Sequence, residues 1–117
     1  MSAEEIFEQR MRLGRLFDIY GGLLTDKQKQ CLALYFYDDL SLSEISEELS
    51  VSRQAVHDLL KRVEQLLERY ESSLKVLAKE EAKQIQLHEV IDLLQSSDEK
   101  KKNEAVNILY KLCGESR

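Results

Sequence analysis

The sequence predicts an all-α protein of six helices, and three features support that prediction. The 117 residues contain no proline and four glycines, so no strong helix breaker lies between Gly22 and Gly114. Leucine, glutamate, lysine and glutamine, which favour helices, are common there. Hydrophobic residues make up 43% and charged residues 33% of the chain, a balance typical of a folded domain. The length favours a single domain, residues 1–117.

The first two expected helices are separated by a pair of glycines. Residues 3–20 carry apolar side chains at helical spacing, namely Ile6, Met11 or Leu13, Phe17 and Tyr20. Gly21 and Gly22 are expected to end this helix, since glycine accepts a left-handed cap. Thr25 is a suitable N-cap for the second helix. The dense apolar residues from Cys31 to Phe36 predict that this helix is buried.

Two further helix starts lie within the stretch SLSEISEELSVSRQAVHDLLKR, which runs from Ser41 to Arg62. Ser41 and Glu44 form a capping-box sequence, because each side chain can bond the backbone amide of the other residue. Ser52 is expected to cap the fourth helix, whose apolar stripe continues to Leu77. The stripe fits either a straight helix to residue 78 or one that bends near residues 72–73.

The last two helices are expected at about 79–95 and 98–113. Ser97 is the expected cap of the sixth helix and Gly114 its end, and the two helices would form an αα-hairpin. The apolar positions expected to face inward are Ala82, Ile85, Val90, Ile91, Leu94, Ala105, Val106, Ile108, Leu109 and Leu112. We expect residues 71–117 to form a helical extension through which the chain makes a homodimer.

The spacing of small and apolar residues in the third and fourth helices predicts a helix-turn-helix, with residues 24–70 as its core. Ser46 is small where the two helices would cross, and Ser50 falls at the turn. Val56 follows in the second helix, where an apolar side chain locks the crossing. The turn often prefers glycine, so either Ser50 carries a modest backbone strain or the turn differs slightly from the usual form.

The stretch LTDKQKQCLALYFYDDLSLSEISEELSVSRQAVHDLLKR, about a third of the chain, resembles region 4 of bacterial sigma factors. A freestanding chain of this size with a C-terminal helical extension is similar to the YlxM-like helix-turn-helix family. The resemblance implies a cytoplasmic bacterial protein with a regulatory role. It also implies a link to the signal recognition particle pathway, which was inferred for the family from genetic proximity.

The expected nucleic-acid-binding residues lie in the first turns of the fourth helix, which would enter the major groove. They are Ser52, Arg53, Gln54, His57, Lys61 and Arg62. Arg53 suits a bidentate contact to guanine and Gln54 one to adenine. Ser52, Lys61 and Arg62 suit phosphates, and His57 is a further polar contact. DNA is the expected partner, with RNA as a second possibility.

The charge of the chain supports an alternative function. The net charge is -5, and Asp58 lies among the predicted contact residues. Residues 50–62 hold three basic side chains against this one acid, a net charge of +2, which is little for tight binding to phosphates. The alternative is a helical adaptor that binds protein or RNA components of the signal recognition particle, with the helix-turn-helix as scaffold.

No enzymatic activity, metal or cofactor is expected. His57 and His88 have no evident metal-ligand partners, and no glycine-rich phosphate loop is present. Cys31 and Cys113 each lie among apolar residues and are expected to be buried free thiols. The first residues lack the apolar core of a signal peptide, and no stretch is long enough to span a membrane, so a cytoplasmic location is expected.

Overall fold

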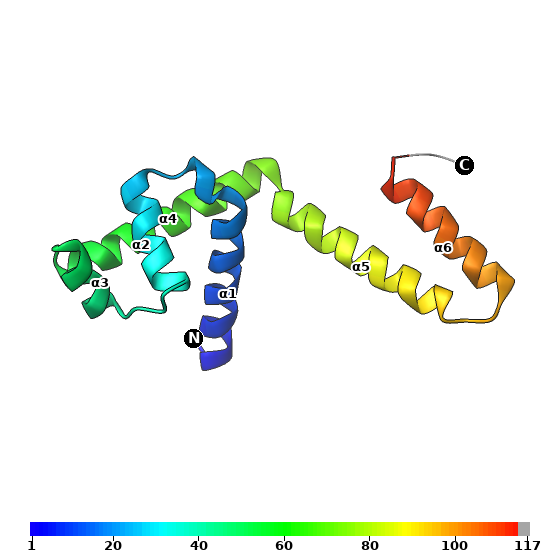
Figure 1. Ribbon diagram of the computed structural model, residues 1–117, viewed down its shortest axis with the longest axis horizontal. Helices are drawn as coiled ribbons and strands as arrows, with labels where there is room; N and C mark the ends of the chain where they lie inside the picture. The colour runs from blue at the N-terminus through cyan, green and yellow to red at the C-terminus, as the bar shows by residue number, and fades with distance from the viewer. Residues whose placement is uncertain (115–117) are drawn as a thin grey trace. The chain divides into compact units, whose positions relative to one another are not determined.

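The computed structural model describes residues 1–114, and all of their regular structure is helical. The elements are α1 (Ala3–Tyr20), the 3₁₀ turn η1 (Gly21–Leu23), α2 (Asp26–Phe36), α3 (Leu42–Leu49), α4 (Arg53–Leu74), α5 (Val76–Leu94) and α6 (Glu99–Leu112) (Figure 1). The expected all-α fold with six helices is therefore confirmed. The helices form two compact units, Met1–Leu77 and a C-terminal unit that begins at Ala78.

The connection between α1 and α2 depends on the missing side chain of Gly21, and not on a left-handed backbone. Gly21 has φ -54° and ψ -30°, so the expected left-handed cap was wrong. A Cβ atom at this position would lie 3.1 Å from two carbon atoms of the Phe17 ring. Glycine therefore makes room for a core aromatic side chain while the chain tightens into η1.

The second helix begins as expected at Thr25. The Thr25 hydroxyl accepts a hydrogen bond from the backbone N–H of Gln28 at 3.2 Å. The side-chain oxygen of Gln28 accepts one from the backbone N–H of Thr25 at 3.0 Å. Thr25 and Gln28 thus form a complete capping box, which satisfies two donors at the start of α2.

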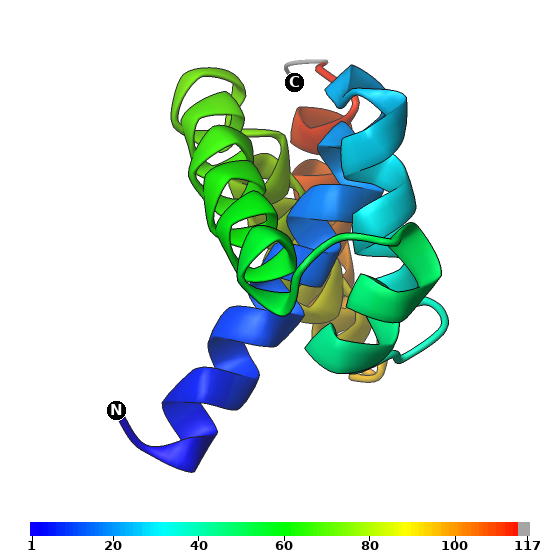
Figure 2. The same ribbon diagram turned by 90° about the vertical axis from the view of Figure 1, so that its left-hand side faces the viewer.

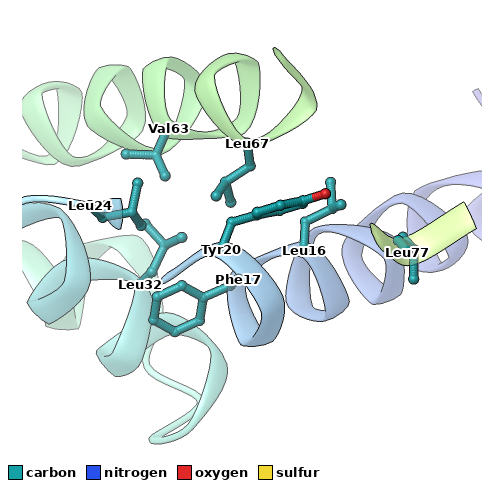
Figure 3. Packing of buried hydrophobic residues seen from close by; sticks show 8 residues of the cluster. All are labelled: Leu16, Phe17, Tyr20, Leu24, Leu32, Val63, Leu67 and Leu77. Carbon is teal, nitrogen blue, oxygen red and sulfur yellow. The ribbon is translucent and has the colours of Figure 1, made fainter. Parts of the chain in front are cut away.

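The main hydrophobic core of the N-terminal unit lies between α1, α2 and α4. Its buried residues are Leu16, Phe17, Tyr20, Leu24, Leu32, Val63, Leu67 and Leu77. Figure 3 shows Val63 and Leu67 descending from α4 toward the side chains of α1. The buried face of α4 therefore holds it against α1, while its N-terminal turns remain available for other contacts.

The first turns of α1 extend past the rest of this unit (Figure 2). Ile6, Phe7 and Met11 are each more than half exposed. Ile6 and Met11 belong to the apolar face that the sequence predicted, but only the second half of α1 reaches the core. The reason is that α2 and α4 pack against residues from Leu13 onward.

The end of α4 is determined by a buried cluster of polar groups. Lys75 adopts the left-handed conformation with φ 55° and ψ 30°, and α5 starts at the next residue. The buried Glu71 carboxylate accepts hydrogen bonds from the Tyr20 hydroxyl at 2.6 Å and from the backbone N–H of Leu77 at 3.0 Å. Tyr20 in turn accepts a bond from the N–H of Val76 at 3.2 Å.

These bonds satisfy N–H groups that a new helix leaves without partners in its first turn. A side chain of α1 and one of α4 therefore cap α5. The apolar stripe of the fourth helix fitted both a straight and a bent helix. In the structure the helix breaks at Lys75, close to the expected residues 72–73. Leu77 therefore belongs to the following helix, α5.

The C-terminal unit is an antiparallel hairpin of α5 and α6 (Figure 1). Asp98, and not the expected Ser97, caps α6 by accepting a hydrogen bond from the N–H of Lys100 at 3.0 Å. Gly114 follows α6 with φ 80°, the left-handed conformation that glycine accepts easily.

Within residues 78–114, only Val90 and Ala105 are buried. Six of the positions expected to face inward are more than a third exposed: Ala82, Ile85, Ile91, Leu94, Val106 and Leu109. Cys113 is exposed as well, so the expectation of a buried thiol holds for Cys31 alone. The physical reason is that each helix of a hairpin has one neighbour, which covers only a narrow part of its apolar face.

Candidate nucleic-acid interface

The turn between α3 and α4 is closed by backbone hydrogen bonds. The N–H of Ser50 donates to the carbonyl of Glu47, and the N–H of Val51 donates to the carbonyl of Ser46 at 3.1 Å. This pair of bonds is the Schellman motif, which ends a helix with one left-handed residue. Ser50 supplies that residue with φ 55° and ψ 42°. Ser50 therefore adopts the positive φ for which this turn often prefers glycine.

Both helices of the motif begin at the predicted serines. The Ser41 hydroxyl and the Glu44 carboxylate bond each other's backbone N–H at 3.1 and 3.0 Å. The bond from the Ser41 backbone, more than that from its side chain, lowers the pKa of the Glu44 carboxyl below its ordinary value. The Ser52 hydroxyl accepts from the N–H of Ala55 at 3.0 Å and so caps α4.

A second core lies beneath the motif and holds its helices together. Cys31, Ile45 and Val56 come from α2, α3 and α4 and are buried against one another. Burial raises the pKa of the Cys31 thiol, which therefore stays protonated and packs as a small apolar group. Leu49, Val51 and Leu59 surround this cluster. The crossing of α3 and α4 is thus fixed from below by a third helix.

All six predicted contact residues are exposed, but they do not share one hollow. Lys61 lines a separate hollow with Glu64, Gln65 and Glu68. Arg53, Gln54 and His57 line a hollow of about 300 Å³ together with Leu42 at the start of α3. Arg62 instead lines a hollow of about 400 Å³ on the α2 side of α4.

The larger hollow contains residues that sequence reasoning did not select. Lys27 and Asp58 line it with Arg62, so a lysine of α2 joins the basic groups of α4. Lys27 and Arg62 are far apart in the sequence, and no local pattern relates them. They line the same hollow only because α2 packs on α4.

Asp58 has direct contacts with two of the predicted residues. Its Oδ1 atom accepts a hydrogen bond from the side-chain amide of Gln54 at 2.9 Å. The Nδ1 atom of His57 lies 3.6 Å from the same oxygen. The spacing of four between Gln54 and Asp58 was the signal for this pair, because residues four apart meet on a helix surface.

The charge around the exposed side of α4 is mixed. Arg53, Lys61 and Arg62 are basic, and Asp58 lies among them. On α3 the exposed side chains of Glu44, Glu47 and Glu48 add negative charge. Such a surface favours contacts at a few defined phosphates over a broad electrostatic attraction to any polyanion.

Comparison with known proteins identifies the family of the chain. Residues 7–108 match the model of the UPF0122 family, described as "Putative helix-turn-helix protein, YlxM / p13 like". The chain belongs to this family. This match confirms the predicted resemblance to YlxM-like proteins. It also agrees with the predicted helix-turn-helix, because the family is described by that motif.

Curated relatives in this family align with most of the chain. A UPF0122 protein of Halalkalibacterium halodurans is 47% identical over 97 residues, which cover 80% of this chain and 89% of the relative. One of Bacillus mycoides is 46% identical over 99 residues, or 85% and 88% of the two chains. One of Bacillus thuringiensis is 51% identical over 79 residues, or 68% and 72%.

Two other features are absent from the part of this UPF0122 chain that the structure describes. Residues 1–114 contain no group of three or more His, Cys, Asp or Glu side chains that could hold a metal ion. Among the same residues, no helix is both long enough and apolar enough to cross a membrane.

Proposed function

We propose that this protein is a DNA-binding regulator that inserts the first turns of α4 into the major groove. The observation that carries the proposal is the arrangement of α3 and α4. The turn at Ser50 and the core under Val56 hold α4 so that all six predicted contact residues are exposed at one end of it. An α-helix presented in this way fits the width of the major groove.

The contact residues would divide into base readers and phosphate anchors. Arg53, at the first position of α4, suits guanine, and Gln54 and His57 are placed beside it. Lys61 and Arg62 suit backbone phosphates, and Lys27 extends that basic edge onto α2. Ser52 uses its hydroxyl oxygen for the cap of α4, and its hydroxyl proton can still be donated to a phosphate.

The test is binding of the full-length protein to random duplex DNA and to structured RNA across a salt series. Arg53→Ala and Lys61→Ala should each weaken DNA binding and flatten its salt dependence, because each removes a charge that displaces counterions. Arg69→Ala is the matched control, since Arg69 is exposed on α4 but lies about four turns beyond Arg53 and about two turns beyond Lys61. Absence of salt-dependent DNA binding at low salt would contradict the proposal.

The regulator would act as a homodimer formed through the extension that starts at residue 71. In the C-terminal unit, Leu87, Ile91 and Leu94 recur on one exposed face of α5. On α6, the side chains of Val106, Leu109, Tyr110 and Cys113 line an apolar hollow. A unit of this size seldom buries enough apolar surface to be stable alone, and pairing two hairpins into a four-helix bundle would cover these faces.

Dimerisation would present two copies of α4 with two-fold symmetry, as paired half-sites in DNA require. Sedimentation at micromolar concentration should show a dimer, and Leu94→Glu should convert it to a monomer. Gln86→Glu adds the same charge at an exposed polar position of α5 that is turned away from the face of Leu87, Ile91 and Leu94, and it should leave the dimer intact. A wild-type monomer throughout the concentration range would rule out this assembly.

The acidic surface favours a second candidate, a non-enzymatic adaptor in the cytoplasm for protein or RNA components of the signal recognition particle. Asp58 and the exposed glutamates of α3 would weaken contact with DNA phosphates but suit a basic protein surface. In this case the helix-turn-helix is a scaffold. Binding to signal recognition particle RNA or protein, without salt-dependent binding to duplex DNA, would select this function over the first.

A further inference from the structure

The exposed face of α4 carries an acid, Asp58, among the predicted contact residues. Gln54, Asp58 and Lys61 are spaced by four and three residues, so they share one face of the helix. Val56 and Val63 are buried on the opposite face. When α4 enters a major groove, Asp58 therefore faces the base edges beside Gln54, although it also lines the hollow that holds Lys27 and Arg62.

The contact between Gln54 and Asp58 determines what both side chains can offer a base. A carboxylate has no proton to donate, so the Gln54 amide must turn its NH₂ group toward Asp58 Oδ1, which it approaches to 2.9 Å. The Gln54 carbonyl oxygen is then directed away from Asp58. The other Asp58 oxygen, Oδ2, has no hydrogen-bond partner within residues 1–114. The pair thus presents two acceptors, Asp58 Oδ2 and the Gln54 carbonyl oxygen, while one of the two N–H donors of Gln54 is engaged by Asp58.

Two neighbouring acceptors select bases that offer donors in the major groove. Cytosine presents its N4 amino group there, whereas guanine presents the acceptors N7 and O6, which a carboxylate repels. Aspartate and glutamate accept from cytosine N4 for this reason. Adenine offers an amino donor at N6, which suits the Gln54 carbonyl oxygen that points away from Asp58.

We infer that Asp58 is a specificity-determining residue that accepts a hydrogen bond from a cytosine N4 amino group, with Gln54 held beside it as an acceptor. This inference rests on the proposed DNA-binding function and refines it. Asp58 lowers the affinity for DNA in general, because its charge repels phosphates. It recovers affinity only at sites where a cytosine amino group meets it.

The competing interpretation is that Asp58 is a surface acid whose contact with Gln54 merely supports the helix. The two interpretations differ in their dependence on sequence. Repulsion of phosphates acts on every duplex equally, since each carries the same backbone. Selection by a base contact acts at one base pair and nowhere else.

The test begins with selection of duplex DNA from a pool with randomised positions by the full-length wild-type protein. Affinities are then measured for the selected duplex and for versions in which each base pair is exchanged in turn. At one position cytosine should be preferred by about 10-fold. Asp58→Ala should abolish the preference at that position and leave the others, while its affinity for random DNA rises.

Asp58→Asn provides a readout that a structural role would not produce. Asparagine offers a donor and an acceptor and pairs with adenine, so the preferred base at that position should change from cytosine to adenine. Glu48→Gln on α3 is the matched control, because it also removes one exposed negative charge. This control should raise the affinity for all duplexes without changing any base preference. Thermal melting by circular dichroism confirms that each variant is folded.

Two outcomes overturn the inference and are distinguishable. If the wild type binds duplex DNA but Asp58→Ala and Asp58→Asn retain every base preference, Asp58 does not select a base, and the proposed function stands. If the wild type binds no duplex DNA at any salt concentration, the proposed function fails and the inference fails with it.

Discussion

The two units of this chain use similar helical sequences but bury them to very different extents. Leu67 in the N-terminal unit is 0% exposed, whereas Leu94 in the C-terminal unit is 49% exposed. Both leucines lie on apolar stripes at helical spacing. In the first unit a helix meets neighbours on more than one side, and in the hairpin it meets one. The comparison teaches that periodicity determines which face of a helix is apolar, while the number of neighbours determines how much of it is buried.

The largest predicted effect is the difference in the free energy of unfolding between matched leucine-to-alanine substitutions in the two units. Leu67→Ala should lower the free energy of unfolding by about 2–5 kcal/mol, because it leaves a cavity in a closed core. Leu94→Ala should cost less than about 1 kcal/mol in the monomer, since half of that side chain is already in water. Urea denaturation of both variants measures the difference. Equal losses would show that Leu94 is buried in solution, either in a core of the hairpin or between the hairpins of a dimer.

The next effect concerns the polar cluster that ends α4. Glu71→Ala should lower the free energy of unfolding by about 2–4 kcal/mol, because the Leu77 N–H and the Tyr20 hydroxyl lose a buried acceptor. Glu68→Ala removes a carboxylate one turn earlier that pairs with Arg12 at 2.7 Å on the surface. This control should cost less than about 1 kcal/mol. A similar cost for both would mean that the buried cluster stabilises the end of α4 no more than a surface ion pair does.

A smaller effect of opposite sign is expected at the turn of the helix-turn-helix. Ser50→Gly should raise the free energy of unfolding by about 0.5–1 kcal/mol, since glycine adopts φ 55° without strain. The corresponding position after α6 already holds glycine, at Gly114. Ser43→Gly, within α3, should have the opposite effect and destabilise by a similar amount. Thermal and urea unfolding measure both, and a loss of stability in Ser50→Gly would show that its side chain has a further role.

The smallest effect is a shift in the titration of an exposed carboxyl. The pKa of Glu44 lies below its ordinary value because Ser41 donates hydrogen bonds to its charged form. A lowered pKa means that the capping contribution to stability is present above the ordinary pKa of glutamate and is lost as the pH falls through the lowered value. NMR titration should show this shift in the wild type.

The role of Ser41 in this shift is tested by the same titration of one variant and one control. Ser41→Ala should raise the pKa of Glu44 toward its ordinary value, since the capping box then keeps only its backbone bond. Ser43→Ala, which changes a neighbouring serine outside the box, should leave the titration of Glu44 unchanged. An unchanged titration in Ser41→Ala would contradict the assigned role of the side chain.

Much of the candidate site could be predicted because its determinants are local. A capping box joins residues three apart, and the turn at Ser50 is closed by bonds to residues within five positions. The exposure of Gln54 follows from the position of Val56 on the opposite face of α4. The acceptor character of the Gln54–Asp58 pair could not be predicted from residue types alone, because it depends on which rotamers the two side chains adopt.

The sequence by itself determined the helical class, the starts of α2, α3 and α4, and the left-handed turn of the helix-turn-helix. Each follows from interactions within one or two turns of the chain. The tertiary structure decided where α4 ends, since Tyr20 and Glu71 are 51 residues apart. It also decided that Lys27 and Arg62 share a hollow and that the apolar faces of α5 and α6 are left exposed. These outcomes depend on which distant segments become neighbours, and periodicity along one helix carries no information about that.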